Sequence, residues 1–240
     1  NVILYSKNYK NNKNNKNNKI YATNICYLNT HTEFEIVFNK QEKTKVYTNL
    51  IGEFNIDNIL ASFATAYSQG IKIPDIVEGI KRVTHIPGRL EKIDIPADFS
   101  VIIDYAHTPD ALQKVLLTLK KLPHKRLIVV FGCGGDRDRE KRPLMGAIAV
   151  NLADFAIVTS DNPRTEDPQK ILLDIEIGIK RTGKSNYIII PDRKEAIFKA
   201  LSLAGTQDIV LLAGKGHETY QIVGTKKIDF DERQIITEYF

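Results

Sequence analysis

The pattern of apolar and polar positions divides the chain into two regions. Residues 20–50 alternate apolar and polar side chains, as in "FEIVF" and "TKVYTNLI", which predicts half-exposed strands. The next stretch, "GEFNIDNILASFATAYSQGI", spaces its apolar side chains three to five positions apart, which predicts an amphipathic helix ending near Gly70. A second short helix is expected over residues 74–83. The first region is therefore expected to combine a small sheet with two helices.

From about residue 98 onward, short and nearly continuous apolar runs alternate with helical patterns. The runs are "SVIID", "RLIVVFG", "DFAIVTS", "NYIIIP" and "DIVLLAG", and helices are expected near 109–120, 141–153, 168–181 and 192–204. Buried strands separated by helices are typical of βαβ units, so this region is predicted to be an α/β domain with a mostly parallel sheet and helices on both faces. Its last part, "ETYQIVGTKKIDFDE", predicts a hairpin followed by a short helix.

The two patterns meet in the stretch "THIPGRLEKID", which has Pro87 and Gly88 at its centre. Proline and glycine interrupt regular structure, so we expect a hinge here and two domains, residues 1–87 and residues 88–240.

The composition indicates a globular protein of the cytoplasm. Hydrophobic residues make up 42% and charged residues 26% of the chain, and the two cysteines match no metal or redox spacing. No apolar run has the roughly 18–20 residues of a membrane span. The net charge is +5, but "KNNKNNKNNK" at 10–19 contributes four of those charges and is expected to be a solvated loop. Neither nucleic acid nor a membrane is therefore an expected partner. The sequence has no initiator methionine, so we expect a fragment.

Four polar clusters follow predicted strands of the second region. They are "DYAHTPD" after the first strand, "GCGGDRD" after the second, "DNPR" after the third and "GKGHE" after the fifth. Ligands of open α/β sheets bind outside the carboxyl ends of the strands. The four clusters together therefore predict a binding site at one edge of the sheet.

Each cluster has a simpler interpretation when it is taken alone. "DNPR" at 161–164 is a common turn sequence, because Asp and Asn bond their own backbone and Pro fixes its φ angle. "GCGGDRD" at 132–138 is compatible with an ordinary glycine-rich turn, and "GKGHE" at 214–218 with a phosphate loop or a turn that presents a carboxylate. His107 and His217 are expected to form structural hydrogen bonds, since no spacing here suggests a zinc site.

One stretch matches the phosphate-binding expression G-x-x-x-x-G-K-S but lies in the wrong context. Residues 178–185 read "GIKRTGKS". A phosphate loop needs a strand before it and a helix after it, so that the helix N-terminus faces the phosphates. Here the expected order is a helix and then a strand, so we predict a structural connection.

Six motifs occur in an order that resembles the Mur ligase family. They are "GEFNIDNILAS", "IPGRLE", "VIIDYAHTPDAL", "GCGGDRDREKRPLM", "DNPRTEDP" and "GKGHETYQ", and the resemblance covers residues 52 to about 230. It is most specific for the branch that adds meso-2,6-diaminopimelate to UDP-N-acetylmuramoyl-L-alanyl-D-glutamate in peptidoglycan synthesis. It implies a C-terminal Rossmann-like, amino-acid-binding domain, preceded by the end of a central ATPase domain.

The resemblance also implies which residues bind substrates. The positions that match the family's diaminopimelate contacts are Arg137, Asp161, Asn162, Pro163, Arg164, Gly214 and Glu218. The positions that match its ATP contacts are Asn55, Asn58, Arg89 and Asp104. Diaminopimelate is a zwitterion at each end, so a carboxylate beside a guanidinium can bind both groups of one stereocentre. Lysine has no second carboxylate, and relatives that add lysine lack the arginine of "DNPR". Asn55 and Asn58 share a helix face, although Asn55 is also a candidate N-cap.

The implied chemistry is amide formation with ATP and Mg²⁺ and with UDP-N-acetylmuramoyl-dipeptide and diaminopimelate as substrates. The γ-phosphate passes to the D-glutamate carboxylate, and the amine attacks the acyl phosphate. The family's P-loop, magnesium ligands and carbamylated lysine have no match here, so the main catalytic residues and the metal ligands are expected upstream. Two alternatives stay open: a ligase like the folate polyglutamate synthetases, which share the architecture, and a non-catalytic amino-acid-binding module.

Overall fold

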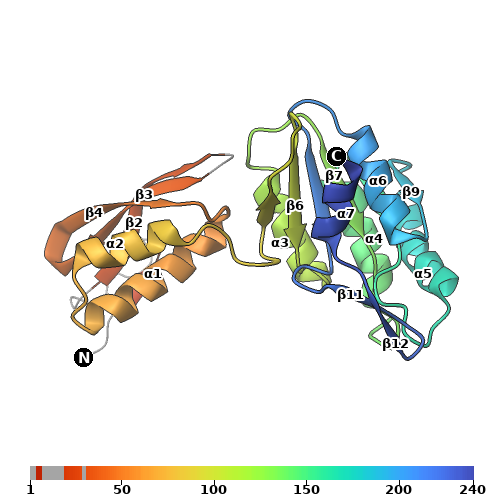
Figure 1. Cartoon of the computed structure of the whole chain (residues 1–240), viewed down its shortest axis with the longest axis horizontal. Helices are drawn as coiled ribbons and strands as arrows, with labels where there is room; N and C mark the ends of the chain where they lie inside the picture. Colours follow the sequence, from red (N-terminus) through yellow and green to blue (C-terminus); the bar gives the residue numbers. More distant parts are fainter. Residues whose placement is uncertain (1–3, 7–18, 29–30) are drawn as a thin grey trace. The chain divides into compact units, whose positions relative to one another are not determined.

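The computed structural model describes residues 4–6, 19–28 and 31–240. The chain divides into two compact units, Asn1–Ile86 and Pro87–Phe240, and each is described by itself (Figure 1). Residues 10–18 of the lysine- and asparagine-rich stretch expected to be a solvated loop lie outside the described residues, and its last residue, Lys19, begins β2.

The first unit is a sheet with two helices. Its strands are β1 (Leu4–Ser6), β2 (Lys19–Tyr27), β3 (Thr32–Phe38) and β4 (Glu42–Thr48), with a short 3-10 turn at Asn39–Gln41. They pair in the order β1-β2-β3-β4, with β1 parallel to β2 and the other pairs antiparallel. The helices are α1 (Glu53–Ser68) and α2 (Ile73–Arg82). The expected small sheet followed by two helices is confirmed.

The alternating pattern of β3 explains how this sheet meets its helices. Phe34, Ile36 and Phe38 are buried in one cluster with side chains of α1 and α2, while Glu33 before them is exposed and Glu35 among them is half-buried. The ring of Phe38 lies 5.5 Å from that of Phe63 on α1. Because successive side chains of a strand point to opposite faces, the period of two buries the face toward the helices, while the opposite face carries Glu33 and Glu35 together with the buried Val37.

The second unit holds a six-stranded sheet, a two-stranded hairpin and five helices. The sheet strands are β5 (Glu91–Ile93), β6 (Ser100–Asp104), β7 (Leu127–Phe131), β8 (Phe155–Val158), β9 (Tyr187–Ile189) and β10 (Ile209–Ala213). The helices are α3 (Pro109–Leu119), α4 (Lys141–Leu152), α5 (Pro168–Arg181), α6 (Arg193–Leu203) and α7 (Glu232–Tyr239). The hairpin is β11 (Tyr220–Val223) with β12 (Lys226–Asp229). Only β5, which has three residues, was not predicted.

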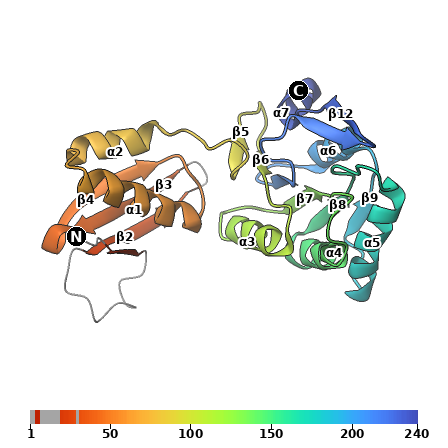
Figure 2. The same ribbon diagram turned by 90° about the horizontal axis from the view of Figure 1, so that it is seen from below.

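The sheet order is β5-β6-β10-β7-β8-β9, and every pair is parallel except β5 with β6. Helices α3, α4 and α5 lie on one face and α6 and α7 on the other (Figure 2). Alternate side chains of the strands, such as Val101, Ile128 and Val210, pack with Ile197 of α6 and Ile236 of α7. The predicted mostly parallel α/β sheet with helices on both faces is confirmed.

Local sequence signals mark the starts of two helices in the second unit. The hydroxyl of Thr108 accepts a hydrogen bond from the backbone N–H of Ala111, and Pro109 occupies the first turn of α3. Asp167 caps α5 in the same way, with Pro168 following it. These caps fix where the loops after β6 and β8 end and where α3 and α5 begin.

Candidate functional site

The loops that carry the four polar clusters leave neighbouring strands of the sheet. They follow β6, β10, β7 and β8, which are consecutive in the sheet order. The pairing of Asp104 with Ala213 and of Phe131 with Val158 shows that the strands end at the same level. The four clusters therefore meet at one edge of the sheet, as the sequence predicted.

Asn162 connects two of these loops through its side chain. Its Nδ2 donates a 2.9 Å hydrogen bond to Oε2 of Glu218, and its Oδ1 accepts from Lys215 Nζ at 3.1 Å and from the backbone N–H of Ile222 at 2.9 Å. Asn162 and Lys215 are buried, and Glu218 is half-buried. The "DNPR" and "GKGHE" loops and the start of the hairpin are thus held in one arrangement.

Asp161 adds a second carboxylate to this cluster. It is 7% exposed, its Oδ1 lies 3.6 Å from the ammonium of Lys215, and that oxygen makes no hydrogen bond within the described residues. A methyl group on Gly214 would lie 3.9 Å from it. A buried carboxylate oxygen without a donor is costly, so this atom is suited to accept a hydrogen bond from a cationic ligand.

Arg164 is fixed through its backbone. Its φ angle of +52° is unusual for a residue with a side chain. The N–H of Arg164 donates to the carbonyl of Ile222 at 3.0 Å, and its carbonyl accepts from the N–H of Gly224 at 2.7 Å. Its guanidinium donates through Nη1 to the carbonyl of Gly135 at 2.8 Å. The hairpin therefore holds the strained turn and directs the guanidinium toward the glycine-rich loop.

The glycines of "GCGGDRD" serve close packing against "DNPR". A Cβ on Gly135 would lie 1.9 Å from the carbonyl oxygen of Pro163, and a Cβ on Gly132 would lie 2.2 Å from that of Thr159. A Cβ on Gly134 would lie 2.8 Å from Nη1 of Arg164 and 3.8 Å from Cγ of Arg137. The loop therefore approaches the "DNPR" turn closely and brings two of the predicted substrate-binding arginines together.

Arg137 is exposed, and its guanidinium donates to the carbonyl of Asp136 at 3.0 Å. Asp136, which has a positive φ of 53°, accepts hydrogen bonds from the hydroxyl of Thr165 at 2.8 Å and from its backbone N–H at 3.1 Å. Arg137 thus extends from a turn that the "DNPRTED" segment holds in place, and its side chain faces solvent.

A carboxylate that the sequence analysis did not single out ties the same two loops together. Glu166 accepts hydrogen bonds from Arg142 at 2.8 and 3.0 Å, from Arg139 at 2.9 Å and from the backbone N–H of Asp136 at 2.6 Å. Arg142, which is fully buried, also donates to Asp174 at 2.9 Å. The hydrogen bonds from Arg142 hold the pKa of Glu166 at about 2. Nothing in the spacing of "TEDP" indicated this role.

The end of β6 holds a turn at Arg89 and Leu90. Asp104 is 4% exposed, and its carboxylate accepts from the backbone N–H groups of Leu90 at 2.8 Å and Ala106 at 2.9 Å. Burial raises the pKa of Asp104, and the two hydrogen bonds oppose that shift. The guanidinium of Arg89 lies 5.4 Å from the centre of the Tyr105 ring. Asp104 therefore holds the backbone that presents Arg89.

In the first unit, Asn55 and Asn58 lie on one face of α1 and contact each other. Asn55 is buried, and its Nδ2 donates to the carbonyl of Ile51 at 2.8 Å, while its Oδ1 accepts from Nδ2 of Asn58 at 3.3 Å. The N-cap of α1 is Gly52, so the alternative that Asn55 caps the helix is wrong. The hydrogen bond from Asn58 to Asn55 therefore orients the side chain of Asn58.

The stretch "GIKRTGKS" is structural, as its context predicted. Gly178 lies inside α5, and a Cβ there would lie 1.9 Å from the carbonyl oxygen of Pro143. Gly183 adopts a φ of +73° just after the helix, and Nζ of Lys184 donates to the carbonyl of Val150 at 3.2 Å. The segment joins α5 to β9, so it cannot place a helix N-terminus on a phosphate.

Other candidate chemistry is limited in the described part of the chain. No group of three or more His, Cys, Asp or Glu side chains there could hold a metal ion. His107 lies 2.9 Å from the carbonyl of Tyr105 through Nδ1, and Cys133 is a buried thiol whose pKa burial raises to about 12. No helix among residues 4–6, 19–28 and 31–240 is both long and apolar enough to cross a membrane.

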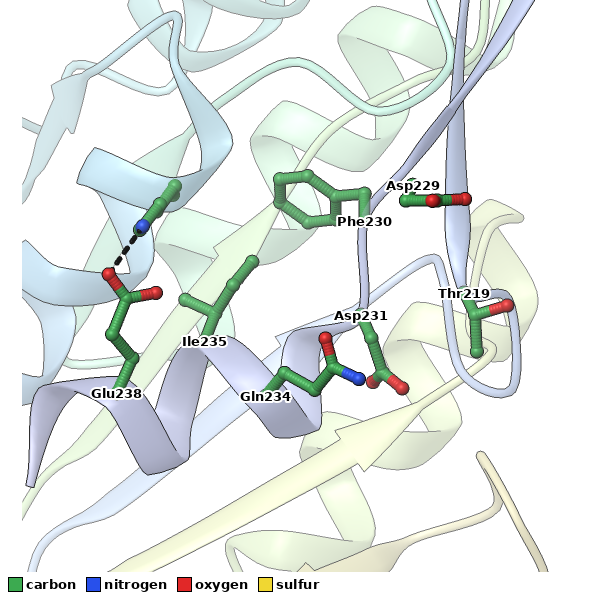
Figure 3. A pocket seen from close by; sticks show the side chains of 8 residues that line it. Thr219, Asp229, Phe230, Asp231, Gln234, Ile235 and Glu238 are labelled. Carbon is green, nitrogen blue, oxygen red and sulfur yellow. Dashed lines mark hydrogen bonds and ion pairs between the residues drawn. The ribbon is translucent and has the colours of Figure 1, made fainter.

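A cavity of about 460 Å³ lies beside the hairpin and α7 and contains none of the predicted site residues. Figure 3 shows Gln234, Ile235 and Glu238 along α7, with Phe230 and Thr219 on the other side. The ring of Phe230 is also 5.6 Å from the ammonium of Lys215. The cavity therefore lies next to Lys215, which bonds Asn162 of the candidate site.

Comparisons with known proteins agree with the motifs. Residues 88–216 match the family described as "Mur ligase, glutamate ligase domain". The chain is 53% identical over 189 residues to the UDP-N-acetylmuramoyl-L-alanyl-D-glutamate–2,6-diaminopimelate ligase of Syntrophomonas wolfei, a match that covers 79% of this chain and 39% of the relative. The chain thus spans about two fifths of that relative's length.

Two solved structures bear on the fold. A UDP-N-acetylmuramoyl-L-alanyl-D-glutamate–2,6-diaminopimelate ligase superimposes with a TM-score of 0.71 at 38% identity, covering 99% of this chain and 47% of the other. The folylpolyglutamate synthase of Mycobacterium tuberculosis superimposes with a TM-score of 0.62 at 20% identity, covering 81% of this chain and 45% of the other. The second likeness shows a shared fold alone.

Proposed function

Because this chain belongs to the Mur ligase family, we propose that it is the amino-acid-binding portion of an ATP-dependent ligase. The ligase adds meso-2,6-diaminopimelate to UDP-N-acetylmuramoyl-L-alanyl-D-glutamate. This is the reaction in the name of the Syntrophomonas wolfei relative. The proposal places the activity in the cytoplasm, where ATP is available.

One observation carries the proposal: groups of opposite charge flank Asn162. Asp161 precedes it and Glu218 accepts a hydrogen bond from its side chain, with one oxygen of Asp161 lacking a hydrogen-bond donor among the described residues. The guanidinium of Arg164 donates to the backbone carbonyl of Asn162 at 3.4 Å. An ammonium and a carboxylate on one carbon fit such a pair, and the arginine fork suits a carboxylate in particular. Arg137 and Gly214 complete the proposed contacts.

In the proposed reaction this chain binds and orients the amine. The site holds one zwitterionic end of diaminopimelate, and the amine at the other end attacks the acyl phosphate of the D-glutamate carboxylate with loss of phosphate. Binding one end of diaminopimelate lowers the translational and rotational entropy that the amine still has to lose when it attacks. The acyl phosphate must also be kept from water, which closure of domains achieves in enzymes of this kind.

For ATP we propose contacts within each unit: Asn58, which Asn55 orients, in the first, and Arg89, which Asp104 positions, in the second. The hydrogen bonds from the Arg89–Leu90 turn to Asp104 and from Asn58 to Asn55 support this division. Magnesium is implied by the family, but the described residues offer no group of ligands for it. No step is therefore assigned to the metal.

Titration calorimetry of the 240-residue chain tests the amino-acid site. We expect meso-diaminopimelate to bind, L-lysine to bind far more weakly, and L-glutamate, the amino acid that folate polyglutamate synthetases add, not to bind. Binding of glutamate in preference to diaminopimelate would contradict the proposal. Activity is tested in a fusion that joins the upstream part of the Syntrophomonas wolfei ligase to this chain. Diaminopimelate binding without ligation by that fusion would favour a binding module.

A further inference from the structure

Lys215 is a fully buried lysine in the middle of the candidate site, and the family resemblance assigned it no role. It lies between Gly214 and Gly216, whose φ angles are +117° and +55°. Residues with side chains rarely adopt such angles. A Cβ on Gly216 would lie 2.6 Å from Cβ of Tyr105, so the loop also packs too closely for other residues. The backbone on both sides of Lys215 therefore has a conformation that favours glycine.

The ammonium of Lys215 determines how Asn162 is oriented. An ammonium has only hydrogen-bond donors, so Asn162 must present its oxygen, Oδ1, toward Nζ. The backbone N–H of Ile222 imposes the same orientation, because it also donates to Oδ1. The amide nitrogen of Asn162 then faces the opposite way and donates to Glu218. Lys215 therefore acts on Glu218 through Asn162.

The ammonium is also the counter-charge of two carboxylates. Nζ lies 3.6 Å from Oδ1 of Asp161 and 3.7 Å from Oε2 of Glu218. The nearby Arg193 and Glu232 form a buried ion pair of their own, at 2.8 Å. The cluster therefore carries two negative charges against one positive charge, and one cationic ligand would balance it. Without Lys215, both carboxylates would lose the cation that lies within 3.7 Å of each, and removing one partner of a buried charge pair is unfavourable.

We propose that Lys215 is the positioning residue of the amino-acid site, which orients Asn162 toward Glu218 and holds the carboxylates of Asp161 and Glu218 in place for the substrate ammonium. The proposal rests on the proposed function for the identity of the ligand. The orientation of Asn162 by Lys215 is independent of which ligand the site binds. A purely structural role would instead consist of the hydrogen bond from Nζ to the carbonyl of Tyr220 at 2.7 Å.

The first test needs no ligand. The side-chain amide of Asn162 should give a distinct, slowly exchanging NMR signal in the native 240-residue chain, since it is buried and bonded to Glu218. In Lys215→Met that signal should shift and exchange faster. Lys184→Met is the matched control, because Lys184 also bonds a backbone carbonyl but lies just before β9. An Asn162 signal unchanged by Lys215→Met would overturn the proposal.

The second test is a double-mutant cycle on diaminopimelate affinity, measured by calorimetry on the same chain. We expect Lys215→Met to weaken binding at least about tenfold, as loss of a buried charge partner does. In a Glu218→Gln background the same change should weaken it little further, because residues that act through each other are not additive. Equal losses in both backgrounds would contradict the proposal.

If Lys215→Met does not fold, the native chain still tests the role of the lysine. The ¹⁵N signal of the Lys215 ammonium should shift when diaminopimelate saturates the site, and no such shift would refute the role. If the native chain binds no diaminopimelate, the proposed function fails, while the Asn162 signal still decides the positioning role. The two failures are therefore distinguishable.

Discussion

The side-chain amide of Asn162 donates a 2.9 Å hydrogen bond to the carboxylate of Glu218, 56 positions further along the chain. The two residues follow β8 and β10, which are separated in the sheet by β7 alone. One side chain therefore joins loops that the chain reaches through two intervening helices. Stability and substrate binding are expected to depend on the same contacts.

Removing the Asn162 side chain is expected to destabilise the second unit. Asn162→Ala leaves the N–H of Ile222 without its acceptor and Lys215 with the carbonyl of Tyr220 in place of two acceptors, and an unsatisfied buried polar group costs about 1–3 kcal/mol. Urea unfolding of the chain measures the change. Asn151→Ala, at an exposed position of α4, is the control and should stay within about 0.5 kcal/mol of the native chain.

The lowered pKa of Glu166 predicts that the protein loses stability in acid. Its pKa is lowered from 4.5 to about 2 by the hydrogen bonds from Arg142, so its stabilising effect is complete above pH 4.5 and is lost as the pH falls toward 2. Glu166→Gln should be less stable than the native chain at neutral pH and should lose less stability on acidification. Thermal unfolding across that range measures both, and parallel curves for the two proteins would contradict the assignment.

Gly135 is expected to be essential to the shape of the site. In Gly135→Ala the new Cβ would lie 1.9 Å from the carbonyl oxygen of Pro163, so the "DNPR" turn must move. Diaminopimelate affinity should then fall by more than about tenfold, because displaced binding groups lose their alignment with the ligand. Gly205→Ala, whose Cβ would have no neighbour nearer than 3.9 Å, should bind normally. Equal affinities of the two variants would contradict this packing role.

Much of this fold could be predicted because local sequence signals specify its elements. The Thr108–Pro109 start of α3 and the apolar runs of β7 and β10 needed no tertiary information. Strand β5 was missed because its three residues, "EKI", show no period and pair only with β6. The sheet order was likewise inaccessible, since β10 inserts between β6 and β7 through contacts distant in sequence.

The candidate site was predictable as a set of motifs, but the roles within it were not. The pattern placed Asp161, Arg164 and Glu218 at the correct edge of the sheet. It gave no sign that Lys215 would be buried between carboxylates, because a lysine beside glycines is usually exposed. Nor could it pair Glu166 with Arg142, 24 positions earlier, since that contact depends on the loop after β8 meeting the first turn of α4.

The 240-residue chain is expected to hydrolyse no ATP. The stretch "GIKRTGKS" connects a helix to a strand, and Lys184 bonds the carbonyl of Val150. A colorimetric phosphate assay with ATP and magnesium measures this. Activity that is abolished by Lys184→Ala would show that the stretch binds phosphate after all.

Arg164 is expected to decide which amino acid the ligase uses. Both hydrogen bonds of its guanidinium to described residues use Nη1, and a guanidinium has five N–H donors. The remaining donors can bind the carboxylate that diaminopimelate has and lysine lacks. Alanine and lysine both carry a Cβ, so neither replacement adds strain to the positive φ at this position. Arg164→Lys should restore little, because an ammonium cannot form the bidentate fork.

The most direct test is the ratio of kcat/KM for diaminopimelate to that for lysine, measured in the fusion ligase and in its Arg164→Ala variant. Sites that bond a polar group of the substrate reject analogues lacking it by roughly 10⁴–10⁵. We expect a preference of that order in the parent and its loss in Arg164→Ala, with KM for ATP unchanged. A diaminopimelate preference that survives Arg164→Ala would contradict the account and leave "DNPR" as a turn only.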